Sequence, residues 1–262
     1  MDLGLRDRVA VITGGNRGIG YAVSAQLLTE GAHVVVASLD PARNAKAVES
    51  LKAGSNGRVI GVPTDLNDAA AVDRLFKTTL AEFGRLDILV NNAAHIQAGS
   101  FFAMDDAAWA HALDHKIVGV SRCIRHAVPL MKERGWGRII NLSGGAAWHP
   151  QLNSITTGIN NSALLNLTVA LANELGKDGI LVNAVVPSSI RTERHDQNIK
   201  DAVAKTGKSE AEVLKPRVSR IPLGRMGAAD EVASVVAFLA SERAAYVNGS
   251  AWTVDGGATA RL

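Results

Sequence analysis

Short apolar runs alternate with longer amphipathic stretches along almost the whole chain. The runs lack a strict apolar–polar alternation, so each is expected to be a strand buried on both faces, as in a parallel sheet covered by helices. Seven strands are predicted: Val9–Thr13, Val34–Ala37, Val59–Val62, Ile88–Val90, Ile139–Leu142, Leu181–Val185 and Ala251–Val254. The clearest helices predicted between them are Ala69–Phe83, Trp109–Arg134, Ser162–Leu175 and Glu231–Ala240. This order predicts an α/β fold: a doubly wound parallel sheet of about seven strands with helices on both faces.

A glycine-rich turn, Thr13–Gly20, joins the first predicted strand to a predicted helix that begins at Tyr21. Glycines let backbone N–H groups and the positive end of the helix approach a pyrophosphate, which a side chain would block. The turn therefore predicts a Rossmann-like dinucleotide site beyond the carboxyl ends of the strands. Its expected residues are Gly14, Asn16, Arg17, Gly18, Ile19 and Gly20.

The 262 residues are predicted to form a single domain, 1–262, because no linker, internal repeat or low-complexity tract interrupts them. One segment differs, since residues around 190–220 are rich in charge and show no sustained apolar period before Glu210. Two interpretations stay open for it. It is either a small, mobile and partly helical substrate lid beside the site, or a merely solvated loop.

Composition narrows the class of partner. The formal net charge is +3, and no run of five basic residues occurs, so neither nucleic acid nor a membrane surface is expected to bind. No uninterrupted apolar run of 18 residues and no charged-then-apolar leader is found, which favours a cytoplasmic protein. The single cysteine, Cys123, is expected to be a buried thiol, and no ligand spacing predicts a metal.

Further motifs, in order, resemble those of the short-chain dehydrogenase/reductase (SDR) family over almost the whole chain. Besides the glycine-rich turn they are Asp65-Leu66, Asn91–Ala94, Trp109, Gly137–Ser143, Val182–Pro187, Thr192, Ile221–Arg225 and Val254–Gly257. The resemblance implies an enzyme that binds NAD or NADP. It assigns Asp65 to the adenine, Asn91 to the strand end near the cofactor, and Ile190 and Thr192 to the carboxamide of the nicotinamide. Leu66, Ala93 and Pro187 belong to the same cofactor motifs, and Ser188 stands where the family usually has glycine.

The choice between NAD and NADP depends on the end of the second predicted strand. Family members that use NAD typically carry an acid there, which binds the ribose hydroxyls and repels a 2′-phosphate. Here the position falls on Ser38, followed by Leu39 and Asp40. Ser38 and Arg17 could hold a 2′-phosphate, while Asp40 could serve NAD instead. The balance slightly favours NADP(H) over NAD(H), and the alternative that Arg17 and Arg43 are ordinary surface residues stays open.

The resemblance fails at the catalytic positions. The family uses Ser, Tyr, Lys and Asn, and counting from the neighbouring motifs places Gly144, Thr157, Asn161 and Lys116 there. A one-residue slip would put Ser143 at the serine position, but no tyrosine lies in this part of the sequence. A threonine hydroxyl is far too weak an acid to replace a phenol, so another group must transfer the proton, or no proton moves.

Two features keep catalysis possible. Lysine and asparagine have exchanged places, which predicts that Lys116 supplies the ammonium group that the family's lysine would supply from position 161; the alternative is a lysine that reaches the surface. His149 and His95 could act as acids, although either could simply form part of the pocket wall. The candidate catalytic residues are therefore Lys116, His149, Ser143, Thr157 and Asn161.

Three functions remain compatible with these residues. The first is an atypical NAD(P)-dependent oxidoreductase that transfers hydride between the nicotinamide and a small carbonyl or alcohol, using substitute proton-transfer residues. The second is a non-redox lyase, dehydratase or isomerase on the same scaffold, and the third is a catalytically silent dinucleotide-binding protein. Phe101, Phe102 and Trp148 point weakly to an apolar or ring-bearing substrate. The apolar helix Ser162–Leu175 implies, by resemblance, a homo-oligomer, either a tetramer or a dimer.

Overall fold

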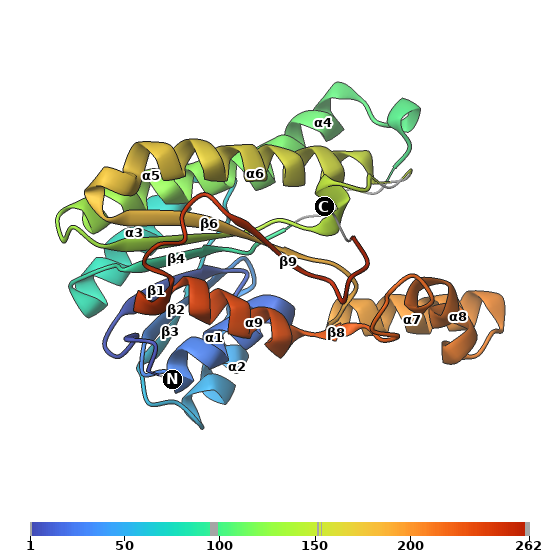
Figure 1. The fold of residues 1–262 in the computed structure, drawn as a ribbon, viewed down its shortest axis with the longest axis horizontal. Coiled ribbons are helices and arrows are strands. Elements are labelled where there is room, and N and C mark those ends of the chain that lie inside the picture. Colours follow the sequence, from blue (N-terminus) through green and yellow to red (C-terminus); the bar gives the residue numbers. More distant parts are fainter. Residues whose placement is uncertain (1, 95–98, 151, 153, 260–262) are drawn as a thin grey trace.

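The protein is built around one parallel sheet of seven strands (Figure 1). The computed structural model describes residues 2–94, 99–150, 152 and 154–259. The strand order is β3-β2-β1-β4-β5-β6-β9, and every neighbouring pair is parallel. The strands are β1 Val9–Thr13, β2 His33–Ser38, β3 Val59–Pro63, β4 Ile88–Asn91, β5 Gly137–Leu142, β6 Ile180–Pro187 and β9 Ala251–Val254. The predicted doubly wound α/β fold is confirmed. Because the order reverses between β1 and β4, a switch point lies at the carboxyl ends of these two strands.

Helices cover both faces of the sheet (Figure 1). One face carries α1 Gly18–Thr29, α2 Pro41–Lys52 and α9 Ala229–Leu239. The other carries α3 Ala69–Phe83, α4 Asp106–Leu113, α5 Gly119–Lys132 and α6 Ile155–Leu175. Successive strand residues point to opposite faces, so Val11 packs in the core under α3 and α5, whereas Ile12 packs in the core under α1 and α9. Burial on both sides explains why the inner strands β1, β4 and β5 are mostly apolar, whereas the edge strands β3 and β9 are partly exposed.

The chain is helical over most of the predicted range Trp109–Arg134, but the helix is not a regular α-helix throughout. Between α4 and α5 the chain forms a π-helical turn, Asp114–Val118, whose wider hydrogen-bond ring interrupts the α-helical register. Apolar residues continue on both sides of the turn, so periodicity alone does not reveal it. Lys116 is the buried residue of this turn. A π-turn is uncommon and often marks a functional site, which makes the position of the lysine notable.

The segment after β6 forms two helices that project away from the sheet (Figure 1). These are α7 Glu193–Thr206 and α8 Glu210–Val218. Helical structure begins well before Glu210, where an apolar period was first expected. The sequence pattern of α7 is weak because Ile199 is its one fully buried residue. The ends of the segment meet in a two-residue parallel pair, β7 Ile190–Arg191 with β8 Gly227–Ala228. The role of this segment as a lid stays a prediction.

A buried carboxylate joins the amino ends of β1 and β4. The side chain of Asp87 is fully buried, and one of its oxygens accepts a hydrogen bond of 2.9 Å from the main-chain nitrogen of Val9. Arg85 and Arg8 both form ion pairs with the same carboxylate, at 2.6 and 3.3 Å. These partners compensate the desolvated charge and hold the two strands in register.

Within the described part of the chain, none of the helices combines the length and the apolar character needed to cross a bilayer. The same residues also contain no group of three or more His, Cys, Asp or Glu side chains arranged to hold a metal ion. The thiol of Cys123 is buried, as expected, and burial raises its pKa to about 12.

Candidate active site

A cavity of about 530 Å³ lies at the carboxyl ends of the strands, across the switch point. Its walls come from the glycine-rich turn, the ends of β2, β3, β4 and β5, the π-turn and the start of α7. Most of the residues predicted from the sequence line it: Gly14, Asn16, Arg17, Gly18, Ile19, Gly20, Ser38, Asp65, Leu66, Ala93, Lys116, Ser143, Pro187 and Thr192. The position of the cavity could therefore be predicted from the sequence.

The glycine-rich turn is held closely against β4. A Cβ atom at Gly20 would lie 2.2 Å from the main-chain oxygen of Gly14 and 2.5 Å from Asn92 Nδ2, so only glycine fits there. Asn92 Nδ2 donates hydrogen bonds to the main-chain oxygens of Thr13 and Gly14, at 2.9 and 3.1 Å. The Thr13 hydroxyl in turn accepts from the backbone nitrogens of Asn92 and Ala93. Asn92, which was not singled out from the sequence, fixes the shape of the turn.

The amino end of α1 is open towards the cavity. Its N-cap residue, Arg17, makes no side-chain capping bond, whereas α2 and α3 are capped by the carboxylates of Asp40 and Asp68. The first N–H groups of a helix need an acceptor, and a phosphate at the positive end of the helix dipole supplies one. This terminus fits the pyrophosphate of a dinucleotide.

Two predicted cofactor residues lie outside the lining of the cavity. Asn91 is fully buried, and its amide donates to Asn141 Oδ1 at 2.9 Å, so it ties β4 to β5. Ile190 lies on β7, and its Cδ1 atom is 2.7 Å from the position that a Cβ of Gly227 would take. Both residues support elements that border the cavity, and their contact with a cofactor stays a prediction.

The corner of the cavity beyond β2, next to the carboxyl end of that strand, is lined by side chains of both charges. Arg17, Asp40 and Arg43 all line the cavity. Asp40 Oδ1 accepts a hydrogen bond from the backbone nitrogen of Arg43, and the two side chains lie 3.9 Å apart. The Ser38 hydroxyl donates to Oδ1 of the buried Asn44, which positions it. Arg17 forms neither an ion pair nor a side-chain hydrogen bond with any residue that the structure describes, so its guanidinium is available to a ligand.

Lys116 reaches the cavity from the π-turn. Only 5% of the residue is exposed, and its Nζ donates a hydrogen bond of 2.8 Å to the main-chain oxygen of Leu142, at the end of β5. Among the described residues, no carboxylate forms an ion pair with it. Burial without a compensating charge lowers the pKa of Lys116 to about 8. The structure thus excludes a lysine that extends into solvent.

The other catalytic candidates occupy different surroundings. Ser143 lines the cavity, and its hydroxyl donates to the main-chain oxygen of Asn161 at 3.1 Å. Asn161 is buried, and the Thr157 hydroxyl accepts a bond of 2.7 Å from Ser154 Oγ. His149 is exposed. The structure does not bring Thr157, Asn161 or His149 into the cavity lining, and His95 lies outside the described residues.

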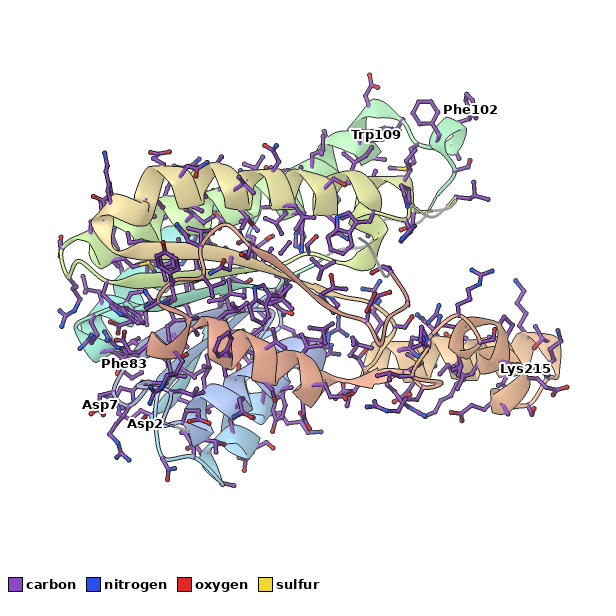
Figure 2. All side chains as sticks on the ribbon, viewed as in Figure 1. Asp2, Asp7, Phe83, Phe102, Trp109 and Lys215 are labelled. Carbon is purple, nitrogen blue, oxygen red and sulfur yellow. The ribbon has the colours of Figure 1, made fainter. Side chains whose placement is uncertain are left out.

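Two aromatic residues expected near the pocket lie at the surface. Phe102 is 96% exposed, and Figure 2 shows it in the segment before α4, away from the sheet. The Phe101 ring is half exposed and packs edge-on against Trp109, with 6.0 Å between ring centroids. Neither phenylalanine lines the cavity, so the apolar character expected of the substrate gains no support from them.

Comparison with known proteins places this geometry in a family. The profile described as "Enoyl-(Acyl carrier protein) reductase" matches residues 14–259. A 3alpha-hydroxysteroid dehydrogenase of Mediterraneibacter gnavus is 36% identical over 255 residues, which cover 97% of this chain and 98% of that protein. A 3-oxoacyl-[acyl-carrier-protein] reductase FabG of Staphylococcus aureus is 35% identical over 252 residues, covering 95% and 96%.

The solved structures agree with the sequence matches. The structure of L-sorbose reductase from Gluconobacter frateurii, complexed with NADPH and L-sorbose, superposes with a TM-score of 0.97 at 33% identity and covers all of both chains. An NADPH-dependent reductase involved in bacilysin biosynthesis, YwfH, superposes with a TM-score of 0.88 at 29% identity, covering 97% of this chain and 99% of that one. The chain therefore belongs to the short-chain dehydrogenase/reductase family, a family of NAD(P)-dependent oxidoreductases.

Proposed function

We propose that this protein is an atypical NAD(P)-dependent oxidoreductase in which Lys116 transfers the proton that a tyrosine transfers elsewhere in the family. The observation that carries the proposal is the buried amine of Lys116, which lines the dinucleotide cavity without a carboxylate partner in the described chain. The substrate class is a small carbonyl compound, or the alcohol in the reverse direction. The names of the relatives include a sugar, a steroid and an acyl thioester, so they support this class and no single compound.

The residues that would hold the dinucleotide follow from the cavity. The uncapped amino end of α1, with Gly18 and Ile19, would bind the pyrophosphate. Asp65 and Leu66 would border the adenine, and Thr192 would lie by the nicotinamide. When bound, the nicotinamide supplies or accepts the hydride.

Arg17 and Arg43 favour NADP(H) over NAD(H). Two guanidinium groups line the corner beyond β2, and the nearby Asp40 carboxylate is engaged by the backbone and side chain of Arg43. A 2′-phosphate would gain charge-assisted hydrogen bonds from the arginines. The solved relatives, whose titles name NADPH, support the same choice.

Lys116 is suited to move a proton in either direction. As an ammonium it can donate to a carbonyl oxygen that accepts hydride, and as an amine it can take the proton back from an alcohol. A pKa near 8 leaves both forms populated around neutral pH, which is the condition for efficient acid–base catalysis. The hydrogen bond to Leu142 fixes the amine at the end of β5 and leaves its other protons for a ligand.

The decisive experiment measures oxidation of NADPH by absorbance at 340 nm with a panel of ketones, aldehydes and 3-oxoacyl thioesters. Turnover by the wild type and a loss of at least about a hundredfold in kcat for Lys116→Met would support the proposal. Lys77→Met is the matched control, because Lys77 is exposed and forms an ion pair with Asp73 on the surface of α3. NADPH binding without oxidation of any panel member would contradict the proposal and favour a non-redox or silent protein.

A homo-oligomer, either dimer or tetramer, belongs to the same proposal. The α6 helix has Ile159 and Val169 exposed to 42% and 49%, and it lies on the outer surface of the molecule (Figure 1). Such apolar exposure on a long helix is typical of a surface that a second copy covers. Light scattering after size-exclusion chromatography would show a multiple of 27.5 kDa, and a monomeric mass would contradict the proposal.

A further inference from the structure

We propose that the side chains of Asn161 and Ser188 bind the carbonyl oxygen of the substrate, over the bare backbone of Gly144 and Gly145. The inference deepens the function proposed above and rests on it only for the class of substrate. No such role was predicted from the sequence for Asn161, which stands at the family's lysine position, or for Ser188, which replaces glycine after Pro187. The positions of these two side chains around Gly144 and Gly145 assign this role to them.

Gly144 lies close to a neighbouring side chain, and its own backbone conformation does not require glycine. Its φ of 175° is an extended conformation that any residue adopts. A Cβ atom there would lie 3.0 Å from Asn161 Nδ2, which is closer than an ordinary contact. A side chain at position 144, where the family carries its substrate-binding serine, would therefore press on the Asn161 amide and shift it by a few tenths of an ångström.

Gly145 repeats this relationship with a second polar group. A Cβ atom there would lie 3.0 Å from Ser188 Oγ and 3.1 Å from Ser188 Cβ. The Cβ position of Gly144 is itself 3.7 Å from the main-chain oxygen of Pro187, directly before this serine. The amide of Asn161 and the hydroxyl of Ser188 thus approach the same dipeptide, which lies outside the lining of the dinucleotide cavity but directly follows Ser143, a residue of that lining.

Neither polar group has a partner within the described chain. The Asn161 side-chain amide and the Ser188 hydroxyl make no hydrogen bond there, although Asn161 is only 7% exposed. Their neighbours differ, since the amide of Asn160 donates to the main-chain oxygen of Ala112 and the hydroxyl of Ser143 donates to that of Asn161. Both groups therefore keep hydrogen-bonding capacity that a ligand atom can use.

The chemistry of the two donors identifies that atom. An amide N–H and a hydroxyl O–H together suit an oxygen with two lone pairs that gains negative charge during the reaction. A ketone or aldehyde oxygen that receives hydride on its carbon is such an atom. Lys116 binds the main-chain oxygen of Leu142, two residues before Gly144, so the donors and the proton source border the same segment.

The test uses a binding measurement that requires no turnover. The affinity of the NADP⁺-loaded protein for hydroxyacetone, a small hydroxyketone, is measured by ligand-observed NMR, and the affinity for NADPH by fluorescence. Asn161→Asp keeps the shape of the side chain without its N–H donors, and Ser188→Ala removes the hydroxyl. Each is expected to weaken hydroxyacetone binding by about threefold to tenfold and to change NADPH binding by less than about twofold.

A coupling measurement separates this role from general damage. Gly144→Ala should weaken hydroxyacetone binding because its methyl group displaces the Asn161 amide. In an Asn161→Ala background, the same substitution should cost nothing further, since the displaced group is already absent. Gly54→Ala is the matched control, because no heavy atom lies within 4 Å of its Cβ position.

Unchanged hydroxyacetone binding in both Asn161→Asp and Ser188→Ala would overturn the inference, as would the absence of saturable binding to the wild type. Absence of NADPH binding or of NADPH oxidation would instead contradict the proposed function, and it leaves this inference to be tested on its own. If NADPH does not bind, the ketone titration is made on the protein without cofactor, and the same comparison of variants decides.

Discussion

The Nζ atom of Lys116 lies 2.8 Å from the main-chain oxygen of Leu142, and this neutral acceptor is the partner that the structure gives to a buried cation. A carbonyl dipole stabilises an ammonium group less than a carboxylate would. The amine therefore loses its proton more easily than an exposed lysine, and burial lowers its pKa to about 8. Both the activity and the stability of the protein should depend on this titration.

Activity should change in opposite directions with pH for the two directions of the reaction. Carbonyl reduction needs the ammonium form of Lys116, so kcat/KM should fall as pH rises through about 8. Alcohol oxidation needs the neutral amine, so kcat/KM should rise through the same range. Initial rates between pH 6 and about 10 test this. Profiles without a change near pH 8, or profiles that Lys116→Met shares, would contradict the role of the lysine.

Stability should also depend on the buried amine. Below about pH 8 the lysine is protonated in both states, whereas between about 8 and 10.5 only the unfolded chain holds the proton. Because the unfolded state then binds more protons, the free energy of unfolding rises with pH in this window. The full difference between these pKa values corresponds to about 3 kcal/mol.

Urea unfolding of the wild type and Lys116→Met, at one protein concentration and at both ends of this range, gives the measurement. The wild type should gain stability relative to the variant as pH rises. Lys77→Met, on the surface of α3, should follow the wild type at every pH. A constant difference between the wild type and Lys116→Met would show that the amine titrates normally.

The arginines beyond β2 should decide between the two cofactors. Arg17→Ala or Arg43→Ala should weaken NADPH binding by about tenfold or more, since each removes a charge-assisted hydrogen bond to the 2′-phosphate. NADH binding should change by less than about threefold. Calorimetry with both cofactors measures this, and Arg74→Ala, an exposed residue on α3, is the control. Equal losses for NADH and NADPH would assign the arginines to another part of the dinucleotide.

The buried carboxylate of Asp87 should be important for folding and not for chemistry. Asp87→Ala removes the acceptor of the Val9 backbone nitrogen and leaves two arginines without their buried partner. A loss of about 3 kcal/mol in the free energy of unfolding is expected from breaking such a network. Urea unfolding measures it, with Asp73→Ala on the surface of α3 as the control. A loss no greater than that of the control would contradict the structural role.

The inner strands could be predicted from the sequence because they are buried on both faces. Val9–Thr13 and Ala251–Val254 have the predicted bounds, although β9 is an exposed edge strand. β6 extends to Ile180–Pro187 because Ile180, Val186 and Pro187 continue the ladder. The π-turn could not be predicted, since a change of hydrogen-bond register leaves the apolar pattern intact. Most of α7 is exposed, and its less exposed side holds few apolar residues, Ile199, Ala202 and Val203 among them, so the apolar pattern in the sequence is short.

The cavity was also largely predictable, because backbone geometry requires its glycines. The partners of individual side chains were not. Asn91 and Asn92 are adjacent in the sequence, yet the first bonds to β5 and the second holds the glycine turn. The approach of Asn161 to Gly144 joins residues from different elements, and only the folded chain brings them together.

The short β7–β8 pair brings the two ends of the segment between its strands together, so this segment is an insert with adjacent ends. Residue 190 pairs with 227 and 191 with 228, so residues 192–226 leave and re-enter the scaffold at one point. Recombination could exchange this insert for another of different length or sequence without altering the strand order of the large sheet. Of this insert, only residues 192–194 line the dinucleotide cavity, so the part beyond them can change without altering the lining of the cavity.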